Sequence, residues 1–379
     1  MRFLAIVALP LALGTPALAQ TGAPTARTVR GGVETGTTPT QSVRGGAETT
    51  WPNQREAEFV LRDFRFASGE TLAELRLHYV TLGAPRRDAA GAVANGVLLL
   101  HGTGGTSGSW LQASLAGELF GPGQPLDAAR YFIIIPDGIG AGRSSKPSDG
   151  LRDRFPRYRY RDMVEAQYRL VTEGLGIRHL HLVMGTSMGG MHTWMWGGMY
   201  PTFMDGLVPL ASQPTAMSGR NWLARRIRIE ALKNAPEAYM YTLPLAQLMT
   251  ESPVRLQEMA PTREAADALY QKMVEDARRN DRLNQLYVVE ASMDYDPSPN
   301  LSKIRALLLA INFADDEINP PELGVVEPAI ARIPHATYVL VPAGPGTHGH
   351  YTYFRAAIWK PHLAAFMKSL EARGPAGSR

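Results

Sequence analysis

Hydrophobic and polar positions along the chain separate short apolar runs from longer stretches with helical spacing. The apolar runs, most of which end in Gly, Pro or Asp, predict strands. They are FVLRDFRF (59–66), LRLHYVTLG (75–83), GVLLLHG (96–102), YFIIIPDG (131–138), LHLVMG (180–185), GLVPLAS (206–212), ALLLAI (306–311) and TYVLVPA (337–343). Runs that are apolar on both faces, with helical stretches such as 160–176 between them, indicate a mostly parallel sheet covered by helices. We therefore predict an α/β core over 53–212 and 301–372.

One segment interrupts this alternation. Between residues 213 and 300 no strand pattern is convincing, and helical spacing appears in WLARRIRIEALKNAP, TREAADALYQKMVEDARR and LNQLYVVEASM. We interpret this segment as a helical lid inserted over the sheet, where it would roof a pocket. Extra helices that pack only for stability are the alternative.

The two ends of the chain have a different composition. Residues 1–19 combine Arg2, an apolar stretch and a small-Leu-small end, which predicts a cleaved secretory signal and an exported, periplasmic or secreted protein. Residues 20–52 are rich in Thr, Gly, Ala and Pro and contain the near-duplicates TVRGGVET and SVRGGAET, so we predict a flexible tether. Residues 373–379 are predicted to be a disordered tail.

Composition and charge narrow the classes of partner. The formal net charge is +4 over 379 residues, which does not favour a nucleic-acid partner, and no apolar run is long enough to span a membrane once the signal is removed. There is no cysteine, so disulfides are excluded. The loop PDGIGAGRSS fails the dinucleotide-binding pattern because Arg143 stands at its third glycine position, and we predict no cofactor.

A serine among glycines is the strongest candidate for chemistry. Gly185-Thr186-Ser187-Met188-Gly189 matches the G-x-S-x-G turn, in which a strand runs into a nucleophilic serine and then into a helix. LHLVM supplies the strand, MHTWMWGGMY supplies a helix, and small neighbours relieve the crowding of a strained turn. An ordinary loop serine is the alternative. The catalytic interpretation requires a base and a carboxylate, which this motif places later in the chain, acid before histidine.

Two later strands end in suitable pairs of residues. ALLLAINFADDEINP delivers Asp315 and Asp316, and TYVLVPAGPGTHGHYT delivers His348 and His350, all expected at one edge of the sheet. These residues alone do not decide between the members of each pair. His78, His101, His335 and His362 lie in strand or helix patterns without a suitable carboxylate nearby and are interpreted as structural.

Backbone N–H groups near Ser187 are the expected oxyanion donors. The backbone N–H of Met188 is one expected donor, and the glycine-rich loop after GVLLLHG supplies the other, from Thr103 or Gly104. The two H-x-H pairs, at 179–181 and 348–350, could place both rings on one face and bind a metal. No third ligand in a recognisable pattern accompanies either pair, so we predict no metal site.

Longer stretches of the sequence resemble the α/β-hydrolase superfamily and, within it, the branch that contains homoserine O-acetyltransferase. They are FGPGQPLDAARYFIIIPDGIGAGRSSKPSD, DMVEAQYRLVTEGLGIRHLHLVMGTSMGGMHTWMWGGMYPTFMD, ADDEINP and GHYT, and the likeness extends from about Phe59 to Phe366. The resemblance implies an α/β-hydrolase fold and a triad of Ser187, Asp316 and His350. It also implies a homodimer as a candidate assembly.

The chain departs from those acetyltransferases at two places. It has GRSSKP where they share a GSTGP-like segment, and SQPTAMSGRNW where they carry an arginine-containing stretch. Arg220 is the nearby candidate for binding substrate. Because coenzyme A thioesters are cytosolic and this chain is predicted to be exported, we expect a serine hydrolase that cleaves a small carboxylic ester or related acyl compound. An O-acyltransferase of the homoserine acetyltransferase type, with the same triad, is the alternative, and a non-catalytic exported binding protein is a third hypothesis.

Overall fold

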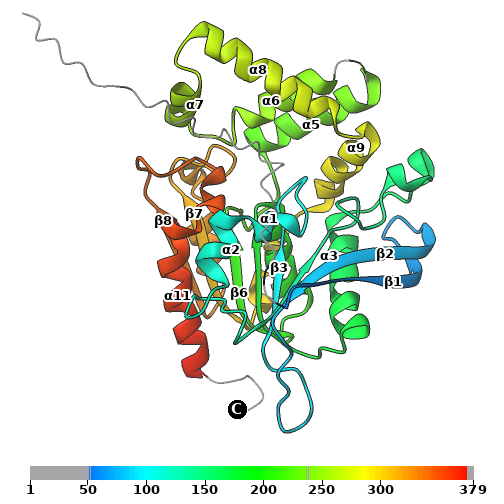
Figure 1. The fold of residues 1–379 in the computed structure, drawn as a ribbon, viewed down its shortest axis with the longest axis vertical. Helices are drawn as coiled ribbons and strands as arrows, with labels where there is room; N and C mark the ends of the chain where they lie inside the picture. Colours follow the sequence, from blue (N-terminus) through cyan, green and yellow to red (C-terminus); the bar gives the residue numbers. More distant parts are fainter. Residues whose placement is uncertain (1–50, 52, 236, 238, 374–379) are drawn as a thin grey trace, which may run out of the picture. The chain divides into compact units, whose positions relative to one another are not determined.

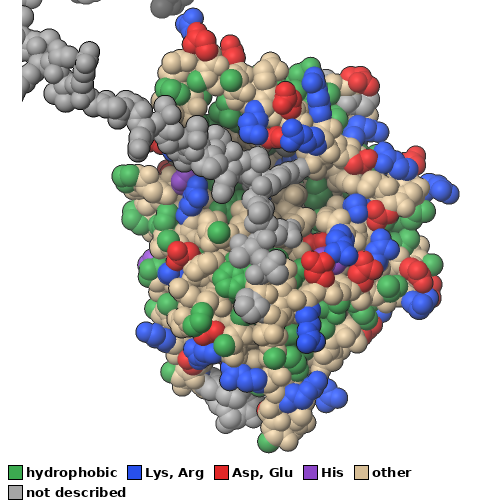
Figure 2. All heavy atoms as spheres, viewed as in Figure 1, with side chains coloured by type: hydrophobic (Ala, Val, Ile, Leu, Met, Phe, Trp, Pro, Cys, Tyr) green, Lys and Arg blue, Asp and Glu red, His purple; other side chains and the backbone are tan. Residues whose placement is uncertain are grey.

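The computed structural model describes residue 51, residues 53–235, residue 237 and residues 239–373. The predicted signal segment, nearly all of the predicted tether and nearly all of the predicted C-terminal tail lie outside the described residues. Within the described ranges, no helix is both long and apolar enough to cross a membrane. On the face that Figure 2 shows, basic and acidic side chains are interspersed.

A single sheet forms the centre of the described chain, with the strand order β1-β2-β4-β3-β5-β6-β7-β8 (Figure 1). Strands β3 to β8 run parallel to one another, whereas β1 and β2 form an antiparallel pair whose inner member joins β4. The α/β prediction with a mostly parallel sheet is therefore confirmed. The strands are β1 (Arg55–Arg65), β2 (Thr71–Leu82), β3 (Gly96–Leu100), β4 (Phe132–Pro136), β5 (Leu180–Thr186), β6 (Met204–Leu210), β7 (Leu307–Phe313) and β8 (Ala336–Val341).

The first two strands are longer than their hydrophobic pattern predicts. They begin at Arg55 and Thr71, and Phe59 of β1 lies opposite Leu77 of β2. Most of the side chains of β1 are exposed, because this strand forms an edge of the sheet. A hydrophobic pattern therefore underestimates its length, while backbone pairing sets its true ends.

Alternate residues of the parallel strands point to opposite faces of the sheet, and each face has its own helical cover. Val97 and Leu99 belong to a buried cluster with α1, α2 and α11, whereas Leu98 and Leu100 belong to a cluster with α3, α4 and α10. The helices outside residues 213–300 are α1 (Gly108–Leu111), α2 (Ala113–Leu119), α3 (Tyr160–Arg169), α4 (Met188–Met199), α10 (Val326–Ile330) and α11 (Ala356–Arg373). The helix predicted over 160–176 ends early, in a π-helical turn at Leu170–Gly174.

A helical segment separates β6 from β7. Its α-helices are α5 (Gly219–Asn234), α6 (Thr242–Gln247), α7 (Pro253–Met259), α8 (Arg263–Arg278) and α9 (Arg282–Glu290), of which α6 and α7 have no counterpart in the predicted pattern. Met188 and Met191, at the start of α4, share a buried cluster with Ile229 of α5 and Leu286 of α9. The segment therefore lies against the turn that follows β5, as Figure 1 shows for α5 and α9 above the sheet.

Candidate active site

Ser187 occupies a sharp turn between β5 and α4. Its backbone angles, φ 54° and ψ −114°, lie in a region that residues with a Cβ rarely adopt. The Ser187 N–H donates to the carbonyl of Leu210 at 2.9 Å, so the end of β6 holds the turn in place. The side chain is only partly buried, whereas its neighbours Thr186 and Met188 are buried. The strand, turn and helix thus present one hydroxyl at the carboxyl end of the sheet.

The glycines beside this serine are required by close backbone approach. A Cβ on Gly185 would lie 2.1 Å from the carbonyl oxygen of Gly189, and one on Gly189 would lie 2.1 Å from that of Leu100. Because both obstacles are backbone atoms, no side-chain rotation could relieve them. The glycine spacing therefore reflects how tightly α4 starts against β3 and β5.

His350 connects the serine to a buried carboxylate. Its Nε2 lies 2.8 Å from the Oγ of Ser187, and its Nδ1 lies 2.7 Å from Oδ2 of Asp316. His350 and Asp316 are 4% and 1% exposed. Since an ionised carboxylate can only accept, Nδ1 carries the proton toward Asp316, and Nε2 is left to accept from the serine hydroxyl. The three residues come from the ends of β5, β7 and β8, as expected for a site at the carboxyl edge of a parallel sheet.

Asp316 is held by several donors besides the histidine. Its Oδ1 accepts the backbone N–H groups of Ile318 at 2.8 Å and Asn319 at 3.0 Å, and its Oδ2 accepts the side-chain amide of Asn319 at 3.1 Å. These bonds fix the orientation of a carboxylate that is almost fully buried. The sequence analysis did not single out Asn319, because an asparagine in a loop after a strand carries no specific signal.

Asp315 and His348, the other members of the two candidate pairs, occupy different positions. Oδ2 of Asp315 accepts the hydroxyl of Thr347 at 2.7 Å and the N–H of Gly349 at 3.1 Å, so this carboxylate holds the loop that carries His350. Nδ1 of His348 lies 3.2 Å from Oε1 of Glu251 in the lid. Burial raises the pKa of Glu251 to about 7 and lowers that of His348. The structure thus brings Asp316 and His350 to the serine, and not Asp315 or His348.

The glycine-rich loop after β3 runs beside the serine. A Cβ on Gly102 would lie 3.4 Å from the Cβ of Ser187, and Gly104 has a φ of +70°. His101 holds this loop: its Nδ1 donates to the carbonyl of Gly102 at 2.8 Å, and its Nε2 accepts the N–H of Gly138 at 2.9 Å. Burial lowers the pKa of His101, which keeps the ring neutral as this pair of bonds requires.

The first N–H groups of an α-helix have no partner within the helix, and Met188 is the first residue of α4. Its amide therefore starts the helix directly after Ser187, while Thr103 and Gly104 follow Gly102 in the loop on the other side. An oxygen that forms beside Ser187 would have backbone donors available from both segments. The choice between Thr103 and Gly104 stays a prediction.

Similarity to known proteins agrees with this fold. The sequence profile of the alpha/beta hydrolase fold family matches residues 95–349, more than half of the chain. The chain belongs to the α/β-hydrolase fold family. It is therefore an enzyme of the α/β-hydrolase superfamily.

The chain is similar in sequence to acyltransferases and similar in fold to an esterase. A probable acyltransferase of Methanothermobacter thermautotrophicus is 30% identical over 74% of this chain and 89% of its own length. The homoserine O-acetyltransferase of Pelobacter propionicus is 37% identical, over 42% of this chain and 46% of its own. The match thus spans about half the length of that enzyme. The solved structure of the acetyl esterase MekB has a TM-score of 0.70 at 23% identity, covering 83% of this chain and 97% of that one, which shows a shared fold.

Two arginines in α5 of this α/β-hydrolase, Arg220 and Arg225, have different surroundings. Arg220, at the start of α5, is exposed and forms an ion pair with Glu317 at 2.7 Å. Arg225, one turn further along, is partly buried and donates to the hydroxyl of Ser292 at 3.2 Å. Burial raises the pKa of Tyr160, and the nearby guanidinium of Arg225 and hydroxyl of Thr103 oppose that shift. Arg225 therefore lies closer to the loop than the spacing of the sequence indicates, while Arg220 remains a prediction.

The histidines of both H-x-H pairs in this α/β-hydrolase contact acidic side chains. His179 and His181 both contact Asp205, at 2.8 and 3.3 Å, a carboxylate whose place in the sequence forms no recognisable ligand pattern with the pair. His348 and His350 contact different acidic residues, as described above. Among the residues that the structure describes, no group of three or more His, Cys, Asp or Glu is arranged to hold a metal ion.

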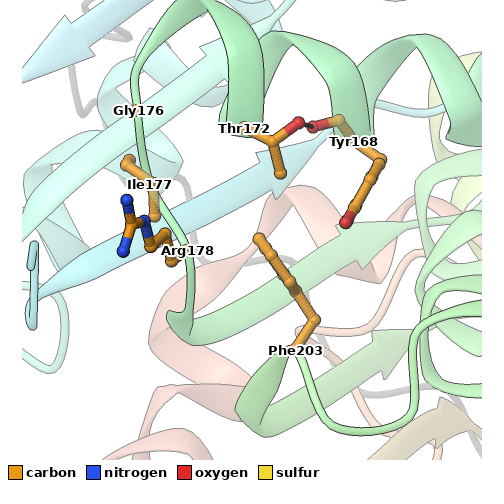
Figure 3. A pocket seen from close by; sticks show the side chains of 6 residues that line it. All are labelled: Tyr168, Thr172, Gly176, Ile177, Arg178 and Phe203. Atoms are coloured by element: carbon orange, nitrogen blue, oxygen red, sulfur yellow. Dashed lines mark hydrogen bonds between the residues drawn. The ribbon is translucent and has the colours of Figure 1, made fainter.

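A surface hollow of about 490 Å³ lies far along the sheet from this chemistry. Figure 3 shows its lining, Tyr168, Thr172, Gly176, Ile177, Arg178 and Phe203. Ile177 and Arg178 precede β5, and Phe203 precedes β6, so the hollow is at the amino end of strands whose carboxyl ends lie near Ser187. Its lining contains no nucleophile beside a base, and the catalytic candidates lie at the opposite edge.

Proposed function

We propose that this α/β-hydrolase is a serine hydrolase that cleaves a carboxylic ester through an acyl-enzyme on Ser187. The observation that carries the proposal is the chain of contacts from the Ser187 hydroxyl through His350 to Asp316, at 2.8 and 2.7 Å. Such a chain lets a neutral imidazole remove the proton of a hydroxyl that is otherwise a weak nucleophile.

The proposed reaction has two halves. Ser187 attacks the acyl carbon while His350 accepts its proton, and the oxyanion is stabilised by the amide of Met188 and an amide of Thr103 or Gly104. The imidazolium, stabilised by Asp316, then protonates the leaving alcohol. In the second half His350 removes a proton from water, which attacks the acyl-enzyme, releases the acid and restores the serine.

The experiment that tests this proposal compares wild type with Ser187→Ala on a panel of esters of varied acyl length. Mutants that lose the nucleophile keep only the small catalysis given by binding, so we expect kcat to fall by at least about 10⁴-fold. A serine-directed phosphonate should label the wild type and not the variant. Wild-type turnover in Ser187→Ala would overturn the proposal.

A second candidate function is O-acyl transfer with the same three residues. It is supported by the named relatives, a probable acyltransferase and a homoserine O-acetyltransferase. In that reaction an alcohol such as homoserine, instead of water, attacks the acyl-enzyme. Product analysis with and without homoserine separates the two: O-acylated product formed at the expense of free acid supports transfer, and unchanged acid release supports hydrolysis.

A further inference from the structure

Asn319 makes an unusual set of contacts beside the candidate triad. Its side-chain nitrogen lies 3.1 Å from Oδ2 of Asp316, 3.0 Å from the carbonyl oxygen of Ala211 and 3.4 Å from Nδ1 of His350. An amide group has two hydrogens, and the carboxylate and the carbonyl account for both. Nδ1 of His350 already donates to Asp316, so its approach to Asn319 is proximity without a hydrogen bond.

The orientation of this amide follows from its surroundings. Turning the group over would bring its oxygen against a carboxylate and a carbonyl, which both only accept. In the observed orientation Asn319 is 2% exposed, and its own Oδ1 has no hydrogen-bond partner among the described residues. A buried amide with an unsatisfied oxygen costs stability relative to an apolar side chain of the same size. Packing alone therefore does not explain an asparagine here.

The carbonyl that Asn319 contacts belongs to a strained turn. Ala211 directly follows β6 and has a φ of 52°, which is unfavourable for a residue with a Cβ. The residue before it, Leu210, accepts the N–H of Ser187. Hydrogen bonds thus join the nucleophile, the end of β6, Asn319, Asp316 and His350 in one closed circuit.

We propose that Asn319 is a positioning residue that acts through Asp316 on His350. Its amide fixes the carboxylate relative to the end of β6. It also donates to Oδ2, the oxygen that accepts from the imidazole, and so limits how strongly that oxygen stabilises the imidazolium. A carboxylate that loses one donor becomes a stronger acceptor for those that remain. The inference rests on the proposed function, because it assigns Asn319 a role in that reaction.

Other titratable groups surround this pair and stay unchanged in the test. The ring of Tyr353 lies edge-on to His350 at 5.3 Å, and burial raises its pKa well above the ordinary value. Asp315 is bound by Thr347 and Gly349 on the histidine loop. Among the described residues, Tyr338 also lies near Asp316, and Glu317 on the same loop pairs with Arg220.

The experiment compares Asn319→Leu and Asn319→Asp with wild type across pH 5 to 9. Leucine keeps the branching at Cγ and removes both donors, so we expect kcat/KM to fall about tenfold, mainly in kcat, and the midpoint of the acid limb to rise by about half a pH unit. Aspartate shares a proton with Asp316 at low pH and can donate it in place of the amide. Its activity relative to wild type should therefore fall by roughly tenfold from pH 6 to pH 9.

A matched control is available in β7, the strand that precedes Asn319 in the chain. Asn312 is also 2% exposed, and its side chain bonds to the backbone of Ser212 at 3.0 and 3.3 Å and contacts the side chain of Tyr338. Asn312→Leu removes a buried amide without removing a contact to Asp316 or His350. We expect it to lower Tm while the midpoint of the acid limb stays at the wild-type value.

The outcomes separate this inference from the proposed function. Two results would overturn the inference. One is a wild-type kcat/KM with a wild-type acid limb in Asn319→Leu. The other is a ratio of Asn319→Asp activity to wild-type activity that does not change with pH, and this second test applies even if the leucine variant fails to fold. NMR titration of the His350 ring reads the same shift without turnover. An upward shift in Asn319→Leu supports the positioning role even where the wild type cleaves no ester, a result that would count against the proposed function alone.

Discussion

Histidine and aspartate meet at both edges of the parallel sheet, but the two meeting places differ. At the carboxyl edge, His350 joins Asp316 on one nitrogen and the Ser187 hydroxyl on the other. At the amino edge, two histidines share one carboxylate, that of Asp205. In the contacts found among the described residues, only the first arrangement places a hydroxyl against a histidine that a carboxylate orients.

Burial and cover differ between the edges as well. The side chains of His350 and Asp316 are 5% and 0% exposed, whereas that of His179 is 34% exposed. Lid residues 250–252 pack against the histidine loop at the carboxyl edge, where the N–H of Tyr351 donates to the carbonyl of Thr250 at 3.1 Å. Charge interactions gain strength where water is excluded. A histidine–carboxylate pair therefore gains catalytic capacity from a hydroxyl as third partner and from the exclusion of water.

The largest expected effect comes from exchanging one oxygen at the covered edge. Asp316→Asn presents an amide to Nδ1 of His350 and favours the tautomer whose Nε2 carries the proton, so the ring can no longer accept from Ser187. We expect kcat to fall by about 10⁴-fold, and Tm to fall as well because the new amide nitrogen faces the side-chain amide of Asn319. Steady-state kinetics on the best ester of the panel measures this. A loss below about tenfold would show that the edge does not work as a triad.

The fold was largely predictable, because buried parallel strands give apolar runs that are legible in the sequence. The serine, one candidate aspartate and one candidate histidine were also found, since a glycine-lined turn and the ends of strands leave local signals. What the sequence could not show depends on contacts between distant segments. His78, interpreted as lacking a suitable carboxylate, lies 2.9 Å from Asp137 at the end of β4.

The same limit applies to Asn319 and Asp205. Each acquires its partners only when neighbouring strands align: Asn319 meets Ala211 across 108 positions, and Asp205 meets His179 across 26. Hydrophobic periodicity reports which face of a strand is buried, but it carries no information on which polar ends face one another. Pairing of this kind requires the sheet order.

A smaller effect tests whether the lid is what covers the carboxyl edge. Burial raises the pKa of Glu251 to about 7, above its ordinary value. Between the ordinary value of about 4.3 and about 7 the folded protein therefore binds more protons than the unfolded chain, and stability falls as pH rises. Glu251→Gln is neutral at every pH. We expect its Tm relative to wild type to increase by a few degrees from pH 5 to pH 8.

Calorimetry of both proteins at the two pH values measures this difference. His348, whose pKa burial lowers, makes a contribution of opposite sign, but it is present in both proteins and largely cancels in the comparison. A Tm difference that stays constant with pH would show that Glu251 is not desolvated by the packing of the lid on the histidine loop.

The smallest expected effect is at the open edge. Asp205→Asn makes the same exchange of one oxygen for an amide as Asp316→Asn, in a cluster where no serine hydroxyl is found against the rings. Partly exposed ion pairs contribute about 0–1 kcal/mol, so we expect the free energy of unfolding to change by no more than about 1 kcal/mol. We expect kcat/KM to stay within about twofold of wild type, because Asp205 lies at the amino end of β6 while Ser187 follows the carboxyl end of β5. Denaturant unfolding and ester kinetics check both values, and a large loss of turnover would mean that the two edges are coupled through β5 and β6.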